Sequence, residues 1–133
     1  MTGPVRDLDR LLRTLEPELR PGTWAFVQRP LGSSTEALAP LATFREAEGL
    51  TVLVPVETAE AAGWPIAFRA RWITLTVASD LSAVGLTAAF ASALAEAGIS
   101  CNVMAGVHHD HLFVPEDQGE AALACLQALQ ARA

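Results

Sequence analysis

The sequence predicts an α+β fold in which two similar halves each place helices on one face of an antiparallel sheet. Two observations lead to this prediction. The chain has 133 residues, of which 51% are apolar, which is enough for a buried core in one compact domain or in two small halves. Its apolar residues also switch repeatedly between the alternation typical of strands and the spacing typical of helices.

The first half begins with apolar residues at helical spacing over 5–16, including Val5, and Pro17 and Pro21 indicate where this helix ends. A strand is expected over 24–29, where residues alternate between two faces. The remaining elements predicted for this half are a loop over 30–40, strands over 44–48 and 50–54 joined by a turn or bulge at Gly49, and a helix over 57–63.

The second half opens with a strand predicted over 71–78. Ile73, Leu75 and Val77 form an aliphatic face that should meet helices. Trp72, Thr74 and Thr76 form the opposite face, which suits packing on another sheet or subunit. The later elements are a helix over 82–97 capped by Asp80 or Ser82 and closed by Gly98, a strand over 99–107, a turn over 108–110, a strand over 111–114, and a final helix opened by Pro115.

The element order is α-β-β-β-α followed by β-α-β-β-α. The second half matches all but the last strand of the split β-α-β-β-α-β motif, which is called ferredoxin-like. The first half matches the same motif with its leading strand weak or missing. We therefore expect two ferredoxin-like (βαββαβ) halves with antiparallel sheets, over residues 1–66 and 67–133.

Composition narrows the possible partners. The formal net charge is −6, and the nine cationic residues are all Arg, scattered along the chain, which disfavours nucleic-acid binding. The N-terminal residues lack the apolar core of a signal peptide, and the longest uncharged runs contain Gly, Ser, Thr or Pro rather than a membrane span. Cys101 and Cys125 lack metal-type spacing and are expected to be free thiols in a reducing cytoplasm.

Small and polar residues gather where the strand over 71–78 meets the following helix, at Ser79–Thr87, and again at Ser100–Asn102. Unpaired N–H groups near Ser82–Gly85 can hold a carboxylate, and Asp80 or Asp110 can meet an α-ammonium group. The alternative is a capped helix in which Gly85 permits close packing.

The segment His108–His111 suggests a metal at first sight. In an extended chain it offers only two ligands on each face, too few for a closed zinc site unless a second copy supplies the remainder. A polar hairpin turn is the alternative. No nucleophile motif or paired carboxylates stand out, since Cys101 lies mid-strand among apolar residues, so we expect no catalytic residues and no cofactor.

Four short motifs give the chain a family resemblance that extends from Leu12 to about Leu129. They are Glu46-Ala-Glu-Gly-Leu-Thr, Ala83-Val-Gly-Leu-Thr-Ala, Ile99-Ser-Cys-Asn-Val and His109-Asp-His-Leu-Phe-Val. With these motifs the chain resembles the small bacterial tandem ACT-domain proteins, a family related to the ACT pair of the animal cytosolic arginine sensor.

The resemblance implies a ferredoxin-like regulatory module that binds an amino acid or a similar metabolite at an interface between domains. It places the binding loop at the strand-to-helix junction, with the start of the next strand facing it. The residues it implies are Ser79, Asp80, Ala83, Val84, Gly85 and Leu86 in the loop, Ser100, Cys101, Asn102 and Val103 in the facing strand, and Asp110, which matches an acidic residue of the arginine sensor.

From these observations we expect a non-enzymatic, cytoplasmic, homodimeric module that senses an amino acid, without nucleic acid or membrane as a partner. The alternatives are a ligand-free dimerising interaction module that pairs through the Trp72, Thr74 and Thr76 face, and a metal-binding protein that uses the His108–His111 turn.

Overall fold

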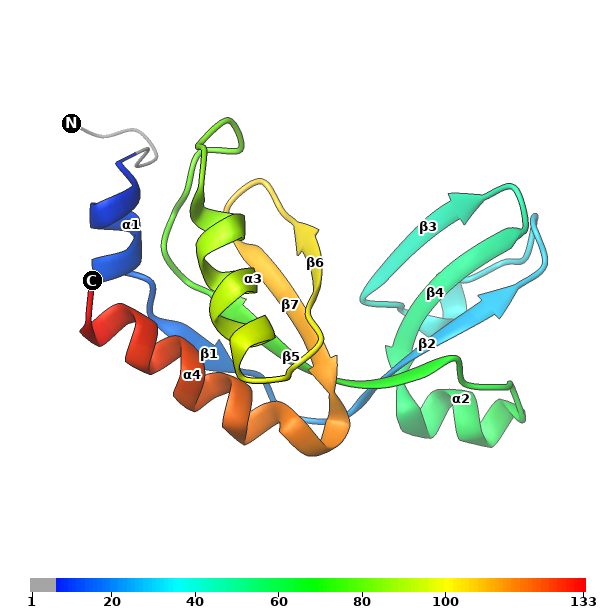
Figure 1. The fold of residues 1–133 in the computed structure, drawn as a ribbon. Coiled ribbons are helices and arrows are strands. Elements are labelled where there is room, and N and C mark those ends of the chain that lie inside the picture. The colour runs from blue at the N-terminus through cyan, green and yellow to red at the C-terminus, as the bar shows by residue number, and fades with distance from the viewer. Residues whose placement is uncertain (1–6) are drawn as a thin grey trace. The chain divides into compact units, whose positions relative to one another are not determined.

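The computed structural model describes residues 7–133, and Val5 of the first predicted helix lies outside them. The chain divides into two compact units (Figure 1). The smaller unit is Gly22–Ala70. The larger unit combines the described residues up to Pro21 with Arg71–Ala133. The predicted halves 1–66 and 67–133 stay a prediction, but the larger unit draws on both ends of the chain.

The smaller unit is an antiparallel sheet with one helix. Strand order is β3-β4-β2-β5, where only the first residues of β5 belong to this unit. The elements are β2 (Trp24–Arg29), η1 (Glu36–Leu38), β3 (Ala42–Glu46), β4 (Gly49–Pro55), α2 (Val56–Ala62) and β5 (Phe68–Leu75). Its core is formed by buried residues of β2, β4 and α2, namely Ala25, Val27, Val52, Val54, Val56 and Ala59.

The leading strand of this first half is present as β2, so the expectation that this strand is weak or missing is wrong. What the half lacks is the first helix of the β-α-β-β-α-β pattern. In its place the chain from Pro30 to Leu41 forms a loop with the single 3-10 turn η1. Pro30 and Pro40 at the ends of this segment, with Gly32 near its start, oppose a regular helix there.

The larger unit contains a short strand that the sequence does not predict. It holds α1 (Leu8–Arg13), β1 (Pro17–Leu19), the rest of β5, α3 (Leu86–Glu96), β6 (Asn102–Ala105), β7 (Asp110–Pro115), η2 (Glu116–Gln118) and α4 (Gly119–Ala131). β1 pairs antiparallel with the end of β5, joining Pro17 to Leu75 and Leu19 to Ile73. It thus occupies the place of the last strand, which the second half lacks in its own sequence.

Pro17 explains why this strand escapes a sequence-based prediction. A proline cannot donate to a ladder, but it is tolerated as the first residue of a strand at a sheet edge. β1 lies on such an edge, and it follows a turn in which Glu16 adopts a positive φ of 47°. Only pairing with β5 makes these three residues a strand.

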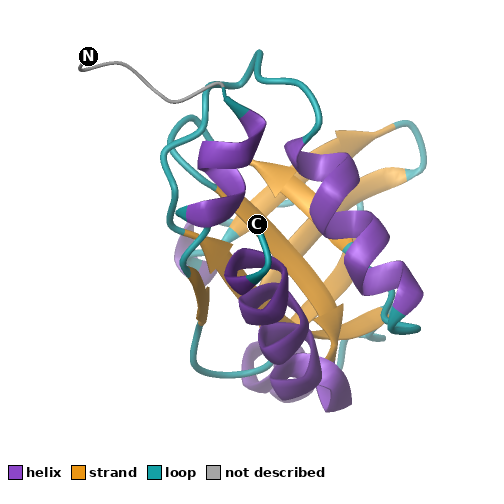
Figure 2. Cartoon of the chain, turned by 60° about the vertical axis from the view of Figure 1, so that its left-hand side comes forward, coloured by secondary structure: helices purple, strands orange, loops and turns teal. Residues whose placement is uncertain are grey.

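The aliphatic face predicted over 71–78 is confirmed, because Ile73, Leu75 and Val77 are buried in the core of the larger unit. The strand itself covers Phe68–Leu75, so it begins earlier than predicted and Val77 follows its end. Helices α1, α3 and α4 supply most of the remaining core residues and lie together over this face; Figure 2 shows them in front of the strands. The largest wholly buried side chain of this core is Phe90 of α3. The predicted α+β class with antiparallel strands and helices is therefore confirmed.

Within residues 7–133, no helix combines the length and the apolar character that a membrane crossing requires.

The side chain of Gln130 in α4 stabilises the turn between α1 and β1 by hydrogen bonds. Its side-chain oxygen accepts a hydrogen bond from the Glu16 N–H at 2.9 Å, and its side-chain nitrogen donates to the Arg13 carbonyl at 2.9 Å and to the Glu16 carboxylate at 2.8 Å. We predict that Gln130→Ala lowers the free energy of unfolding by about 1–2 kcal/mol, measured by urea denaturation.

Gln127→Ala is the matched control, since Gln127 is exposed on the same helix. It should change stability by less than about 0.5 kcal/mol. Equal effects of the two substitutions would contradict the role assigned to Gln130.

Candidate functional site

The junction between β5 and α3 folds into a tight turn before the helix starts. The Asp80 carboxylate accepts hydrogen bonds from the Ser82 N–H at 2.8 Å and from the Ser82 hydroxyl at 2.6 Å. The Ala83 N–H donates to the Asp80 carbonyl at 2.9 Å. Asp80 therefore closes a local turn of the kind that short polar side chains stabilise.

The prediction that Asp80 or Ser82 caps the helix is wrong. α3 begins at Leu86, its N-cap residue is Gly85, and no side chain caps it. Gly85 adopts φ 100°, which L-residues rarely occupy, and a Cβ there would lie 3.1 Å from Leu8 Cδ2. The positive φ favours glycine at this position, and any larger residue would also require the Leu8 side chain to shift by a few tenths of an ångström.

A small cavity of about 100 Å³ lies at this junction. It gathers residues from the connection between β5 and α3, the start of α3, the end of β6 and the start of β7. Its lining consists of Ser79, Asp80, Leu81, Ala83, Leu86, Thr87, Ala105 and Asp110. The sequence named Ser79, Asp80, Ala83, Leu86 and Asp110 as candidate residues, and the structure brings these five together.

The other candidate residues lie outside this lining. Val84 is 86% exposed, and Gly85 serves as the N-cap. In the facing strand Ser100 is exposed, whereas Cys101 and Val103 are half-buried and pack against the core. The Asn102 side-chain nitrogen lies 3.5 Å from the Phe113 carbonyl oxygen. These assignments stay predictions.

Strand direction explains why Ser100–Val103 are not in the lining. The cavity takes Ala105 from the end of β6, together with residues that follow β5. At about 3.3 Å per residue, Ser100 lies a strand length away from Ala105. Sequence reasoning did not name Leu81, Thr87 and Ala105 as site residues, although Leu81 and Thr87 lie within the predicted junction Ser79–Thr87. The Gly106 that follows Ala105 is the signal that marks the end of β6 and could have identified it.

The cavity is acidic, since Asp80 and Asp110 both line it and Ser79 and Thr87 add hydroxyl groups. Burial raises the pKa of the Asp110 carboxyl above its usual value, and the neighbouring His111 charge opposes that shift. An ionised carboxylate that is partly desolvated gains from a cationic partner. The arrangement therefore suits an ammonium group more than an anion.

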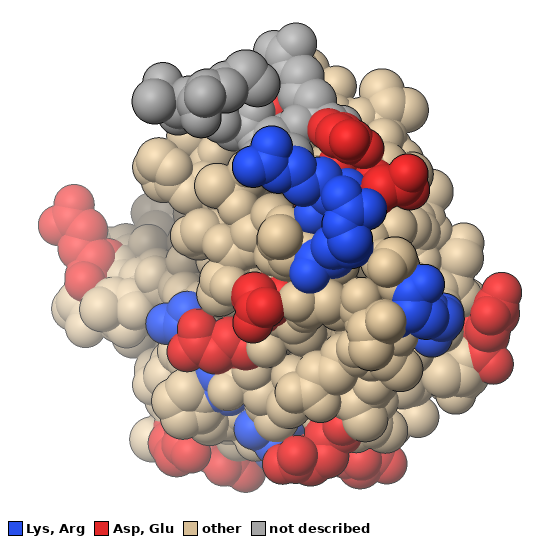
Figure 3. Space-filling model, turned by 90° about the vertical axis from the view of Figure 1, so that its left-hand side faces the viewer, with Lys and Arg blue, Asp and Glu red and all other residues tan. Residues whose placement is uncertain are grey.

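Cys101 is not poised for nucleophilic chemistry. Burial raises the pKa of its thiol to about 11, so the thiol is protonated at neutral pH. Among residues 7–133, no group of three or more His, Cys, Asp and Glu side chains could hold a metal ion. On the face of the molecule shown in Figure 3, Arg side chains are interspersed with Asp and Glu side chains. They form no continuous basic stripe on that face.

His111 belongs to a cluster on the other face of β5. Trp72 Nε1–H donates to His111 Nδ1 at 3.1 Å, so that nitrogen carries no proton, and the Thr74 hydroxyl oxygen lies 3.2 Å from it. The Arg20 guanidinium lies 4.3 Å from the centroid of the Trp72 ring, and Phe113 stacks on the same ring. Thr74 is 2% exposed, so this part of the face is already packed.

The fold and the junction define an α+β module with a small cavity where the chain passes from β5 to α3. Models of the ACT domain match residues 3–71 and 67–128, so the chain belongs to the ACT-domain family and carries two such domains in tandem. ACT domains are regulatory modules that bind small molecules, and the chain is assigned to that class. Among curated proteins no sequence matches significantly.

Solved structures agree on the fold. A Vibrio cholerae protein of unknown function, described as a possible transport protein, is 45% identical with a TM-score of 0.85; the match covers 94% of this chain and 97% of that one. An Agrobacterium tumefaciens protein is 15% identical with a TM-score of 0.67, over 86% and 87% of the two chains. The regulatory subunit of aspartate kinase from Thermus flavus is 12% identical with a TM-score of 0.61, over 85% and 95%.

The cluster around His111 makes stability depend on pH. Burial lowers the pKa of His111 below 6.5, and the nearby His109 and Arg20 charges lower it further, while Asp110 opposes them. The unfolded chain therefore binds this proton more tightly than the folded chain. We predict that stability is fully present above pH 6.5 and falls below it, by at most about 1.4 kcal/mol per pH unit for one proton.

Urea denaturation at several pH values between about 5.5 and 7.5 measures this slope. His111→Gln should flatten the slope. His108→Gln, the matched control in the turn that precedes β7, should leave the slope unchanged. An unchanged slope in His111→Gln would rule out His111 as the responsible group.

Proposed function

We propose that this protein is a non-enzymatic regulatory module that senses an amino acid or a related small metabolite carrying a free ammonium group. The observation that supports the proposal most directly is the pair of carboxylates, Asp80 and Asp110, in one cavity at the strand-to-helix junction. Membership in the ACT-domain family supports the same class of ligand. The proposal places the protein in the cytoplasm, where its free thiols stay reduced.

The size of the cavity limits the part of the ligand that it encloses. At about 100 Å³ it is smaller than most small-molecule sites, which range over roughly 300–1,000 Å³. It accommodates an ammonium group and the atoms next to it, while the rest of the ligand lies at the rim. Such partial enclosure suits affinities in the micromolar to millimolar range, about −4 to −8 kcal/mol.

The rim is apolar and exposed. Leu81, which lines the cavity, is 64% exposed, and Val84 and Val107, which lie within two residues of lining residues, are 86% and 74% exposed. Exposed aliphatic side chains around a polar cavity are typical of a surface that a partner covers. We propose that a second copy of the chain covers this rim in a homodimer and completes the ligand site.

The same three side chains favour a second candidate function, a dimerising interaction module without ligand. The face first considered for that role offers less, because Thr74 is buried and Trp72 is engaged by Arg20 and His111. The two candidates differ in their response to ligand. A sensor is stabilised by its metabolite, whereas a ligand-free module is not.

We predict that at least one standard amino acid raises the Tm of the wild-type protein. At ten times its Kd, a ligand adds about 1.4 kcal/mol, which corresponds to roughly 3–6 °C in a domain of this size. Asp110→Asn removes one carboxylate charge from the cavity without changing its shape and should abolish this shift. Differential scanning fluorimetry at millimolar ligand concentration makes the measurement.

Asp117→Asn provides the matched control, because Asp117 is exposed in η2 and does not line the cavity. It should keep the full shift. If no amino acid changes the Tm of the wild-type protein while analytical ultracentrifugation finds a dimer, the ligand-free module is favoured. If Asp110→Asn keeps the shift, the junction is not the site.

A further inference from the structure

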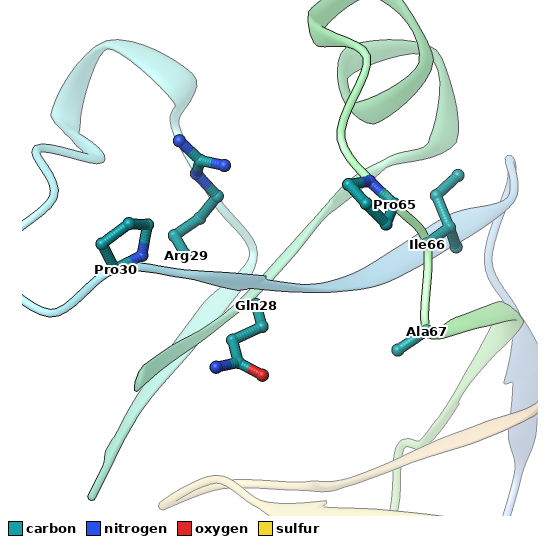
Figure 4. A pocket seen from close by; sticks show the side chains of 6 residues that line it. All are labelled: Gln28, Arg29, Pro30, Pro65, Ile66 and Ala67. Carbon is teal, nitrogen blue, oxygen red and sulfur yellow. The ribbon is translucent and has the colours of Figure 1, made fainter. Parts of the chain in front are cut away.

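A second and larger cavity lies in the smaller unit, where β2 and β5 separate. The ladder between these strands pairs Trp24 with Ala70 and ends at the pair of Phe26 and Phe68. Beyond this last pair the two segments diverge, and a cavity of about 500 Å³ lies between them. Figure 4 shows its lining, with Gln28, Arg29 and Pro30 on one side and Pro65, Ile66 and Ala67 on the other.

The main chain of Gln28 faces this opening. The Ala67 N–H donates to the Phe26 carbonyl at 2.9 Å, so the main-chain groups of Phe26 point towards β5. Main-chain groups in a strand alternate between its two neighbours, so those of Gln28 point the same way. The segment that precedes β5 lies opposite these main-chain groups. It contains Pro65, which has no N–H to donate to the Gln28 carbonyl. Gln28 therefore presents a donor and an acceptor to the cavity.

Arg29 contributes a positive charge beside the same cavity. Its guanidinium lies 4.5 Å from the centroid of the Trp64 ring, a cation–π contact that holds the side chain in place. Figure 4 shows Arg29 leaving β2 on the side where Pro65 lies, whereas Gln28 points the other way. Within residues 7–133, no carboxylate forms an ion pair with Arg29, whereas Arg69 of the same unit pairs with Glu60 at 3.3 Å.

We propose that this cavity binds a small carboxylate that carries an aliphatic part. A guanidinium offers two parallel N–H groups that match the two oxygens of a carboxylate, and Trp64 limits the freedom that Arg29 loses on binding. The Gln28 N–H supplies another donor, and Pro30, Pro65 and Ile66 supply apolar wall. The volume lies within the range of small-molecule sites.

This site is independent of the acidic cavity at Asp80 and Asp110. That cavity suits an ammonium group, whereas this one requires a carboxylate and offers no carboxylate among its lining residues. A carboxylate without an ammonium group therefore distinguishes the two. The probe we choose is 4-methylpentanoate, which has a branched aliphatic chain, and isoamylamine is the matched probe without a carboxylate.

The experiment is a titration of the ¹⁵N-labelled full chain with 4-methylpentanoate, followed by ¹H–¹⁵N correlation spectra up to about 20 mM, a range that detects millimolar affinity. Saturable shifts are expected for the amides of Gln28, Arg29, Ile66 and Ala67. Isoamylamine should not shift the resonances of these amides. Arg29→Gln should weaken the binding of 4-methylpentanoate at least tenfold.

Three variants guard against an indirect effect. Ala67→Phe keeps Arg29 but fills the cavity, and it should also abolish the shifts. Arg69→Gln removes an exposed Arg of the same unit and should bind as the wild type does. Asp110→Asn should also bind 4-methylpentanoate as the wild type does. Loss of ligand binding at the junction is therefore distinguishable from loss of binding in this cavity. Absence of shifts at these four amides, or unchanged binding in Arg29→Gln or Ala67→Phe, would overturn the proposal.

Discussion

Strand β5 is the constraint on which the rest of the structure depends. Among its eight residues, the first three pair with β2 and the last three pair with β1, and β7 is a further neighbour of this strand. The two ACT-domain matches overlap at residues 67–71, where this strand begins. Because side chains alternate along a strand, one inserted residue inside β5 would turn Ile73 and Leu75 from the core to the opposite face. One strand thus ends the first domain and begins the second.

Much of the fold could be predicted from local pattern, and the exceptions share a physical cause. Strands with strong alternation, such as β2 and β5, follow from the sequence because burial of one face decides their state. β1 does not, because three residues beginning with Pro17 become a strand only when the edge of β5 accepts them. The sequence predicts the start of α3 at residue 82 instead of Leu86 for a related reason. The carboxylate of Asp80 can cap a helix or close a turn, and the surrounding chain decides between them.

The candidate site divides in the same way. The loop residues Ser79, Asp80, Ala83 and Leu86 are near one another in the chain, so their gathering follows from sequence proximity and a turn. Asp110 joins them from a distant part of the chain, and here the family resemblance added what periodicity could not. The acidic character of the cavity depends on which side chains line it together, which only the folded chain defines.

The position of β1 has a consequence for how the protein is made. The larger unit needs Leu11 and Leu15 from the start of the chain and Leu112 and Leu126 from near its end. During synthesis the segment with Leu11 and Leu15 leaves the ribosome before Leu112 and Leu126 are made. Its apolar side chains therefore stay exposed until the end of the chain has emerged. The smaller unit lies in one continuous stretch, Gly22–Ala70, and can form as soon as that stretch has emerged. Vectorial synthesis thus favours folding from the middle of the chain outwards, and the N-terminal segment docks last.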